Sequence, residues 1–291
     1  MKRIVVFLVL AVMLFLPGLS MAAGDGAISI LILGTDELGD QTVETDEEMS
    51  RSDAIFVVTL QPRTEAIKLL SIERDYLVEL PDGIGENKLA TSSFFGGPRM
   101  TLDAVNELLQ LEITQYAHID IKNLILAIDI LGGVDVEVYE DEVEEVNLFI
   151  NSILSYYNLS TVSAGINHLD GPETWAFLAV RNNEIQTVES NSVRNDRQRR
   201  VMTACLEMFY DIEYAEIIRL ASEIIPLIKT NLTVSDVLSF IRTALACDFD
   251  KISYMRTPAG EYTLKRINMH KVVIVDDMQR EIENIHQFLY N

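Results

Sequence analysis

"RSDAIFVVTLQPRTEAIKLLSIERDY", residues 51–76, contains two apolar runs that indicate the class of fold. Asp53–Leu60 and Ala66–Ile72 are rich in β-branched and aliphatic residues, and the turn-forming Pro62 lies between them. A third run of the same kind, AISILILG at Ala27–Gly34, precedes them and ends in glycine. We predict three strands. Because strands this continuously apolar are usually covered on both faces by helices, they indicate an α/β fold.

Segments with helical spacing of apolar residues follow the three predicted strands. One further strand is expected in GGVDVEVY, residues 132–139. No internal repeat or Gly/Ser-rich linker interrupts the chain, so residues 24–291 are predicted to form one α/β domain. The predicted helices are Pro98–Leu111 with Thr101 as N-cap, 121–131, an amphipathic segment after an acidic start in 140–160, Gly171–Val180 opening at Pro172, 195–214, Ala215–Ile228, Thr233–Ala246 and a helix that ends the chain in 267–291.

The N-terminus carries an export signal. "MKR" is followed by an unbroken apolar run of 13 residues, Ile4–Leu16, and then by the small residues Ser20 and Ala22. A signal peptide cleaved near Ala22 fits this pattern and would leave a secreted protein. An uncleaved membrane anchor also fits, because Ile4–Ala23 is about 20 residues without a charge, long enough to span a bilayer. Both alternatives place the rest of the chain outside the cytoplasm.

The composition is strongly acidic, with 23 Lys and Arg against 45 Asp and Glu and a net charge of −22. Such a chain repels nucleic acid phosphates at long range, so no nucleic acid partner is expected.

Cys205 and Cys247 allow either one disulfide or two buried thiols in an exported protein. The absence of a C-x-x-C motif or a Cys/His cluster argues against zinc.

Three common catalytic motifs are absent from the sequence. It has no G-x-S-x-G elbow, no G-x-x-x-x-G-K-[ST] loop and no G-x-G-x-x-G turn. A hydrolase with a serine triad, a P-loop nucleotidase and a Rossmann dehydrogenase are therefore disfavoured.

Acidic residues recur at the ends of the predicted strands. Asp36 follows the first strand, and Asp53 opens the second. If these strands are antiparallel neighbours, the two carboxylates meet at one edge of the sheet, which is unfavourable unless a cation lies between them. Mg²⁺ is such a cation, since it binds one or two carboxylates together with phosphate oxygens. The alternative is that each acid caps a loop or pairs with a neighbouring arginine.

Arginines supply the complementary charge. In a helix, Arg194, Arg197 and Gln198 share one face and point into one pocket, whereas Arg199 and Arg200 project elsewhere, solvated or paired with surface acids. Guanidinium groups bind phosphate oxygens in bidentate fashion, and phosphoryl transfer depends mostly on positioning and on neutralising charge. The residues therefore indicate an exported, metal-dependent phosphoryl-group site. Its expected arginines are Arg74, Arg181, Arg194 and Arg197.

The order of several motifs resembles the LytR–CpsA–Psr family of bacterial cell-wall enzymes. The matching stretches are ILILGTDE, RSDAIFVVTL, AIKLLSIERDYLVELPD, KLATSSFFGG, YAHIDIKNLILAIDILGGVDVEV, AGINHLDGPETWAFLAVR and RNDRQRRVM, which together cover about residues 27–210. The resemblance implies a single extracytoplasmic domain, a three-layer α/β/α sandwich around a mixed central sheet, behind an N-terminal membrane anchor at residues 1–23. It also implies a phosphotransferase that moves an anionic glycopolymer from undecaprenyl pyrophosphate onto peptidoglycan, with Mg²⁺ or Mn²⁺ as cofactor and a hydrophobic tunnel for the lipid.

The resemblance also implies roles for individual residues. Asp36 and Asp53 fall at the metal-binding acids of the family. The expected catalytic residues are Arg74, Asp75 and Arg181, and either Asp75 or Asp53 is the expected proton acceptor. The expected pyrophosphate-binding residues are Arg51, Arg74, Lys88, Arg181, Arg194, Arg197 and Gln198.

Two positions depart from the family pattern. Asn183 stands where the V-R-x-R motif has its second arginine, and Ala90 stands where K-I-N-x-A has asparagine. One lost charge-assisted pair is worth about 1.5–3 kcal/mol, which corresponds to roughly one to two orders of magnitude in rate. Two alternatives to the transferase therefore remain. They are a polyprenyl-pyrophosphate phosphohydrolase and a catalytically impaired protein that binds lipid phosphates or wall polymer.

Overall fold

The computed structural model divides the chain into two compact units. The sheet unit comprises the described parts of Phe15–Asp120 and Ile228–Asn291, and the helical unit comprises those of Ile121–Leu227. The structure describes residues 27–35, 51–153, 159–180, 188–207, 219–220, 223–233, 236, 240, 243–244, 247–248, 251–267 and 270–291.

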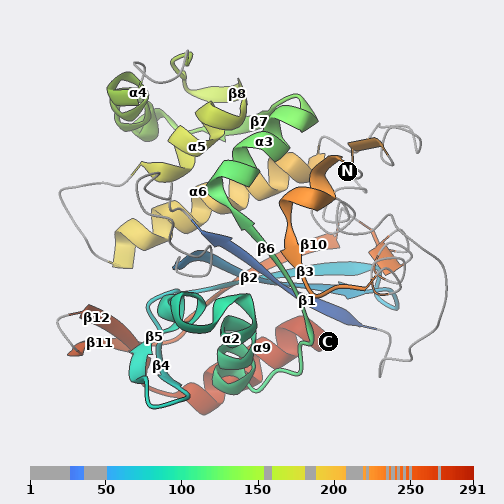
Figure 1. Cartoon of the computed structure of the whole chain (residues 1–291), viewed down its shortest axis with the longest axis vertical. Helices are drawn as coiled ribbons and strands as arrows, with labels where there is room; N and C mark the ends of the chain where they lie inside the picture. Colours follow the sequence, from blue (N-terminus) through green and yellow to red (C-terminus); the bar gives the residue numbers. More distant parts are fainter. Residues whose placement is uncertain are drawn as a thin grey trace. The chain divides into compact units, whose positions relative to one another are not determined.

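A mixed sheet of six strands forms the centre of the sheet unit (Figure 1), in the order β10-β3-β2-β1-β6-β9. β1 pairs with β2 and β2 with β3 in antiparallel fashion, whereas the β1–β6 and β10–β3 pairs are parallel. The α/β class, the mixed sheet and the three predicted strands are thus confirmed. The strands are β1 (Ile28–Thr35), β2 (Ser52–Gln61), β3 (Ala66–Ile72), β6 (Gln115–Asp120), β9 (Lys229–Thr230) and β10 (Ile252–Thr257).

Both faces of the central strands are buried, as their continuous apolar sequence predicts. On one face, Leu33 and Val57 belong to a core that also contains Val105 of helix α2 (Ser92–Leu109) and Leu289 of helix α9 (Met278–Tyr290). Both helices lie on the same side of the sheet in Figure 1. The residues that alternate with these along the strands are buried as well, among them Ile30, Phe56, Val58 and Leu69.

Helix α2 begins earlier than its sequence predicted. Its first turns start at Ser92, and Gly96 and Gly97 leave helical geometry before the helix resumes at Pro98. The prediction that Thr101 is an N-cap is wrong, because Thr101 is fully buried within the helix. Its hydroxyl accepts a hydrogen bond of 2.8 Å from the Ser92 hydroxyl.

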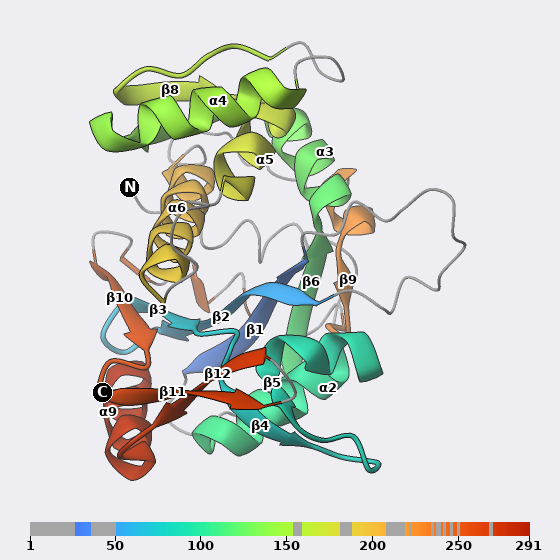
Figure 2. The ribbon, with the colours of Figure 1, turned by 90° about the vertical axis from the view of Figure 1, so that its left-hand side faces the viewer.

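Two short hairpins complete the described part of the sheet unit, and the sequence pattern indicated neither. They are β4–β5 (Leu77–Leu80 and Gly85–Lys88) and β11–β12 (Tyr262–Ile267 and His270–Val275). They lie beside each other in Figures 1 and 2. Tyr76, just before β4, forms a bridge with Val273 of β12. β11 is exposed and shows little alternation of apolar and polar residues, so its sequence resembles that of a loop. The helix predicted in 267–291 is α9, which begins only at Met278, because His270–Val275 form β12.

The helical unit has its own core. α5 begins at a capping box in which Asp170 accepts a hydrogen bond from the backbone N–H of Glu173, and Pro172 lies in its first turn as predicted. Phe177 and Val201 are buried in this core. The elements of the unit are α3 (Ile121–Leu131), β7 (Val134–Val138), η3 (Glu140–Glu142), α4 (Val143–Ile153), β8 (Gly165–Leu169), α5 (Gly171–Ala179), α6 (Val188–Glu207) and η5 (Ile225–Leu227).

Cys205 and Cys247 are free, buried thiols, which decides between the two alternatives that the sequence left open. Burial raises the pKa of Cys205 to about 12 and that of Cys247 to about 11, so both stay protonated at neutral pH.

The apolar leader at residues 1–23 lies outside the described residues. Among the residues that are described, no helix is both long and apolar enough to cross a membrane.

Gly171 provides a test of the packing in the helical unit. A Cβ at this position would collide with the Ile125 carbonyl oxygen and lie 2.8 Å from Asp129 Oδ1, which accepts the Gly171 N–H. We expect Gly171→Ala to lower the free energy of unfolding by about 1–3 kcal/mol, as overpacking does, in urea denaturation. Gly260→Ala is the control, because its Cβ would meet Glu281 only at an ordinary 3.5 Å. Equal stability of the two variants would contradict the packing described for α5.

Candidate active site

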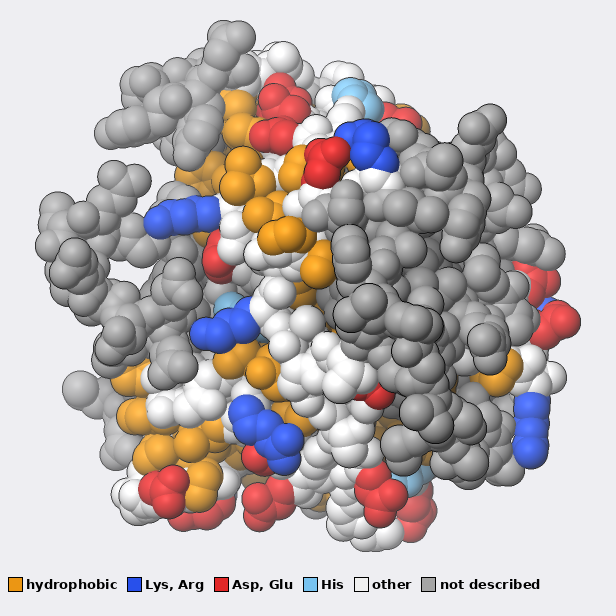
Figure 3. Space-filling view, turned by 45° about the vertical axis from the view of Figure 1, so that its right-hand side comes forward, with side chains coloured by type: hydrophobic (Ala, Val, Ile, Leu, Met, Phe, Trp, Pro, Cys, Tyr) orange, Lys and Arg blue, Asp and Glu red, His pale blue; other side chains and the backbone are white. Residues whose placement is uncertain are grey.

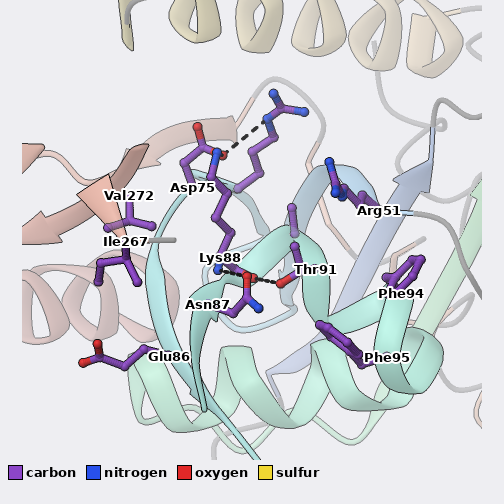
Figure 4. Close-up of a pocket in the computed structure, with 12 residues that line it drawn as sticks. Arg51, Asp75, Glu86, Asn87, Lys88, Thr91, Phe94, Phe95, Ile267 and Val272 are labelled. Atoms are coloured by element: carbon purple, nitrogen blue, oxygen red, sulfur yellow. Dashed lines mark hydrogen bonds and ion pairs between the residues drawn. The ribbon is translucent and has the colours of Figure 1, made fainter. Parts of the chain in front are cut away.

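A pocket of about 290 Å³ opens in the sheet unit where β2 begins and β3 ends. Figure 4 shows Asp75 and Lys88 in its middle, between Val272 and Ile267 of the β11–β12 hairpin and the rings of Phe94 and Phe95. The pocket thus combines charged groups with apolar walls. Its lining residues are Arg51, Arg74, Asp75, Glu86, Asn87, Lys88, Ala90, Thr91, Phe94, Phe95, Ile267 and Val272.

Arg74 and Asp53 meet because β2 and β3 are antiparallel. Asp53 lies at the start of β2 and Arg74 follows the end of β3, so the pairing of Phe56 with Ser71 brings both to the same end of the sheet. An ion pair joins Arg74 Nη1 to Asp53 Oδ1. The Asp53 side chain is 8% exposed and that of Arg74 23%, so the guanidinium retains the more accessible surface of the pair.

A β-bulge lies at Asp53. Gly34 pairs with Ala54 and Thr35 pairs with Ser52, so the residue between them, Asp53, has no cross-strand partner on β1. Bulges of this kind change the direction of a side chain and are frequent beside active sites. The antiparallel pairing of the first two strands, on which the predicted meeting of Asp36 and Asp53 depends, is confirmed.

Asp75 and Lys88 form the second ion pair of the pocket. Lys88 Nζ lies 2.8 Å from Asp75 Oδ1, and Arg74 Nε lies 3.8 Å from the same oxygen. Asp75 therefore lies between two cations. Each of them has a further face that is available to an anion in the pocket, since their side chains are 23% and 19% exposed.

The segment Glu73–Tyr76 is held from three sides by main-chain hydrogen bonds. Ala90 N donates to Arg74 O at 2.9 Å, Val273 N donates to Asp75 O at 2.8 Å, and Glu73 N donates to Thr257 O at 3.0 Å. These bonds connect the segment to η2 (Leu89–Thr91), to β12 and to the end of β10. The charged side chains therefore project from a fixed backbone, which favours binding of a rigid anion.

Glu73, the first residue of this segment, is buried, and its Oε2 accepts a hydrogen bond from Arg256 Nη2 at 3.0 Å. Burial raises the pKa of its carboxyl, the neighbouring Asp75 carboxylate raises it further, and Arg256 lowers it only in part. Tyr76 lies in the same segment, and its hydroxyl and that of Thr257 are 2.7 Å apart. Glu73 is thus a buried support of the segment that carries Arg74 and Asp75, a role the sequence did not indicate.

The predicted metal site is described only in part. Asp53 supplies one buried carboxylate, and Asp36 lies outside the described residues. Within the described ranges, no group of three or more His, Cys, Asp or Glu residues could hold a metal ion. Mg²⁺ can take one or two carboxylates and complete its shell with phosphate oxygens and water, but the Asp53 carboxylate is paired here with Arg74, which is the alternative that the sequence left open for this acid.

The remaining predicted residues are placed as follows. Arg51 lines the pocket and is exposed. Arg181 and Asn183 lie outside the described residues, and nothing is described of the Arg194 side chain. Arg197 and Gln198 lie on α6 in the helical unit. The structure therefore brings together Arg51, Asp53, Arg74, Asp75 and Lys88 within the sheet unit.

Arg197 lies within an ionic cluster in the core of the helical unit. Its side chain is 2% exposed, and its Nε lies 2.7 Å from Glu142 Oε1 and its Nη2 3.2 Å from Glu145 Oε2. Its Nη1 donates to the Val180 carbonyl oxygen at 3.2 Å. Three hydrogen-bond acceptors of the unit therefore already occupy this guanidinium.

Arg200 belongs to the same cluster. It pairs with the partly exposed Asp196 at 2.9 Å, as one predicted alternative has it, but the prediction that it projects away from the core is wrong. Its side chain is 6% exposed, its Nη2 lies 2.6 Å from Glu142 Oε1, and its guanidinium lies 4.2 Å from the centre of the Tyr139 ring. Arg199 pairs with Asp196 at 2.6 Å and is partly exposed, as predicted. Helical periodicity groups the residues of α6 by face, but it does not show which face turns toward the core.

Glu142 is the centre of this cluster. Burial opposes its ionisation, but hydrogen bonds from Arg200 and Arg197 outweigh burial and hold the pKa of the carboxyl below its ordinary value. Glu142 stands in the acidic run EDEVEE, which resembles a solvated helix start, so the sequence did not single it out. On α6, Gln198 Oε1 is buried without a hydrogen-bond partner among the described residues.

Basic side chains do not form a continuous surface on the face drawn in Figure 3. Among the described residues, Lys and Arg appear there singly or in small groups, interspersed with acidic, apolar and other side chains. This fits the acidic composition of the chain, with 23 Lys and Arg against 45 Asp and Glu.

A family model described as the LytR_cpsA_psr family matches residues 17–285. The chain therefore belongs to the LytR–CpsA–Psr family, as its motifs indicated. It is 32% identical over 180 residues to the polyisoprenyl-teichoic acid–peptidoglycan teichoic acid transferase TagU of Halalkalibacterium halodurans, covering 62% of this chain and 52% of that protein. It is 28% identical over 214 residues to the transferase TagV of Bacillus subtilis, covering 72% and 51%. The chain spans about half the length of these curated relatives.

Solved structures share the fold. The crystal structure of B. subtilis TagV aligns with a TM-score of 0.69 at 22% identity, covering 91% of this chain and 98% of that one. TagT with bound octaprenyl pyrophosphate aligns with a TM-score of 0.66 at 20% identity, covering 93% of each chain. TagT bound to LIIa-WTA aligns with a TM-score of 0.70 at 21% identity, with the same coverage.

Because Glu142 pairs with two buried guanidinium groups, we expect the free energy of unfolding to depend on pH. Glu142→Gln removes the charge that compensates two buried guanidinium groups, and we expect it to lower the free energy of unfolding by about 3–5 kcal/mol at pH 7. Because the pKa of Glu142 is lowered on folding, its contribution is present above its ordinary value of 4.5 and is lost as the pH falls through the lowered pKa. The variant should therefore lose less stability than the wild type between neutral and acidic pH in urea titrations.

Glu144→Gln is the matched control, because Glu144 is exposed on α4, two residues away. It should unfold like the wild type at every pH. Equal stability of Glu142→Gln and Glu144→Gln would show that Arg197 and Arg200 do not depend on Glu142.

Proposed function

We propose that this protein is a cell-wall phosphotransferase that moves an anionic glycopolymer from a polyprenyl pyrophosphate carrier onto peptidoglycan. The observation that carries the proposal is the pocket in which Arg74 and Lys88 flank Asp75, while Asp53 holds Arg74 from behind. Two fixed cations with exposed surface suit a pyrophosphate, since guanidinium and ammonium groups bind phosphate oxygens strongly. The names of the TagU and TagV relatives support the same reaction.

In the proposed reaction, a peptidoglycan hydroxyl attacks the phosphorus that carries the polymer. A new oxygen–phosphorus bond forms, the bond from that phosphorus to the bridging oxygen breaks, and polyprenyl phosphate leaves. Arg74 and Lys88 neutralise the charge that develops on the phosphate oxygens. No covalent intermediate on the protein is needed.

Asp75 is the better placed of the two expected proton acceptors. It lines the pocket, with 17% of its side chain exposed, whereas Asp53 is 8% exposed and does not line it. A carboxylate in this position can accept the proton of the attacking hydroxyl. Asp53 orients Arg74 through its Oδ1 atom.

Asp36 and Asp53 would hold Mg²⁺, or Mn²⁺ in its place, together with oxygens of the pyrophosphate. When bound, the ion would supply additional positive charge at the leaving phosphate. Support for this part of the proposal comes from the buried Asp53 carboxylate and from the position of Asp36 directly after β1 in the sequence.

We also propose that the protein works outside the cytoplasm, held at the membrane by its apolar leader. The support is the sequence of residues 1–23 together with a lipid-linked substrate, which lies at the membrane surface. Cleavage near Ala22 would instead release the domain.

A binding protein with weakened catalysis is the second candidate function. The observation that favours it is Asn183, which replaces an arginine of the family motif. The charged residues Arg51, Arg74, Asp75 and Lys88 are all present in the described pocket, which favours the transferase.

The central prediction concerns Arg74. With a polyprenyl-pyrophosphate-linked saccharide, peptidoglycan fragments and Mg²⁺, we expect Arg74→Ala to lower the rate of polymer transfer by about 100-fold or more, as removal of a transition-state donor does. Chromatographic detection of the ligated peptidoglycan measures the rate. Arg280→Ala, on the exposed face of α9, should transfer at the wild-type rate.

Three results would contradict the proposed function or a part of it. Phosphate release that is independent of the acceptor would identify a phosphohydrolase. Lipid binding without turnover, restored to turnover by Asn183→Arg, would identify the binding protein. Full transfer in the presence of a metal chelator would refute the role proposed for Asp36 and Asp53.

A further inference from the structure

Arg74 and Asp75 are the two central residues of a β-turn. Tyr76 N donates to Glu73 O at 3.3 Å, which is the hydrogen bond between the fourth and the first residue of such a turn. Both central residues line the pocket. The positions of their side chains therefore depend on how the two corner residues, Glu73 and Tyr76, are held.

Thr257, the last residue of β10, holds both corners of this turn. Its carbonyl oxygen accepts the Glu73 N–H at 3.0 Å, and its hydroxyl oxygen lies 2.7 Å from the Tyr76 hydroxyl. Thr257 and Tyr76 are both fully buried, so water does not compete for these bonds. A single residue thus spans the base of the turn, with its main chain at one corner and its side chain at the other.

Glu281 of helix α9 fixes the direction of the Thr257 hydroxyl. Glu281 Oε1 accepts a hydrogen bond from Thr257 Oγ1 at 2.7 Å. Because a hydroxyl has only one proton to donate, the Thr257 oxygen is left to accept the proton of Tyr76. Burial raises the pKa of Tyr76, so this hydroxyl keeps its proton and remains a donor. The three groups therefore form a directed chain from Tyr76 through Thr257 to Glu281.

Glu281 is itself held rigidly at the end of β10. Its Oε1 also accepts the Ala259 N–H at 2.8 Å, and its Oε2 accepts the Gly260 N–H at 3.2 Å. Its side chain is buried, and Figure 2 shows α9 next to the end of β10. A buried carboxyl group is retained at a cost unless its oxygens are hydrogen-bonded, and here three donors satisfy them. None of these bonds is made to the pocket directly.

We infer that Glu281 is a positioning residue of the candidate active site, which acts through Thr257 and Tyr76 on the turn that carries Arg74 and Asp75. This rests on the function proposed above, in which Arg74 binds the pyrophosphate. A guanidinium on a fixed turn binds a rigid anion with less loss of conformational freedom than one on a mobile turn. Helix α9, which is distant from the pocket in sequence, thereby contributes to its affinity.

The competing explanation is that Glu281 stabilises only the packing of α9. Three main-chain amides report on the turn and distinguish the two explanations: Tyr76 N–H, Ala90 N–H, which donates to Arg74 O, and Val273 N–H, which donates to Asp75 O. If Glu281 positions the turn, its loss accelerates hydrogen exchange at these three amides. If it serves only α9, exchange increases in α9 and is unchanged at the three amides.

The first measurement is hydrogen–deuterium exchange on the full chain in detergent, for Glu281→Gln and the control Glu283→Gln. Glutamine keeps the shape of the side chain, but its NH₂ group faces a main-chain N–H whichever way the amide is turned. We expect about tenfold faster exchange at the three reporter amides, as the loss of one buried hydrogen bond allows, with unchanged rates in β1 and β2. Glu283 is exposed on the same helix, so its variant should match the wild type.

A second variant tests the same chain without changing a charge. Tyr76→Phe removes the hydroxyl that Thr257 accepts, and it should accelerate exchange at the Ala90 and Val273 amides in the same way. Tyr262→Phe is its control, because that ring is exposed on β11. This variant keeps the inference testable if Glu281→Gln does not fold, which the thermal midpoint establishes.

The second measurement is the binding of octaprenyl pyrophosphate, with Glu281→Gln made both in the wild type and in Arg74→Ala. We expect Glu281→Gln to weaken binding about fivefold when Arg74 is present and to have no effect when Arg74 is absent, because residues that act through one another are not additive. A purely structural role would give the same loss in both backgrounds.

Unchanged exchange at the reporter amides would overturn the inference, as would an equal loss of binding in the two backgrounds. Failure of the proposed function gives a different result. If Arg74→Ala binds octaprenyl pyrophosphate as tightly as the wild type, while Glu281→Gln still accelerates exchange at the three amides, then the pyrophosphate is not bound by Arg74. The positioning of the turn by Glu281 would stand.

Discussion

The ion pair between Arg74 and Asp53 is the interaction on which the site depends. It forms because β2 and β3 are antiparallel, which places the start of one strand beside the end of the other. The bulge at Asp53 frees this residue from cross-strand pairing with β1. A buried carboxylate thus fixes a guanidinium that still has exposed surface, and fixed charge of this kind is what phosphoryl transfer requires.

Arginines serve two different purposes in this protein. Arg74 lies at the edge of a pocket and is partly exposed, whereas Arg197 and Arg200 are buried around Glu142 and hold helix α6 against the rest of the helical unit. Breaking a buried cluster of this kind is costly because it leaves charge without compensation. The sequence motif that contains Arg197 therefore carries structural residues as well as candidate ligand-binding ones.

Much of the sheet unit could be predicted from sequence, because its strands are continuously apolar and Pro62 marks the turn between two of them. The meeting of Arg74 with Asp53 follows from that pairing. The burial of Arg200 could not be predicted, since its partner Glu142 lies 58 residues away in an acidic run that resembles a solvated surface. The β11–β12 hairpin was missed because its exposed strand lacks the alternation that identifies a half-buried one.

In the proposed function, the pocket at Arg74 and Lys88 receives the pyrophosphate of a lipid-linked substrate. A crystal structure of the protein with octaprenyl pyrophosphate and Mg²⁺ tests it most directly. We predict phosphate oxygens about 2.7–2.9 Å from the Arg74 guanidinium nitrogens, with Lys88 beside them, as in charge-assisted hydrogen bonds. A pyrophosphate bound at another place, with Arg74 still paired only to Asp53, would contradict the account.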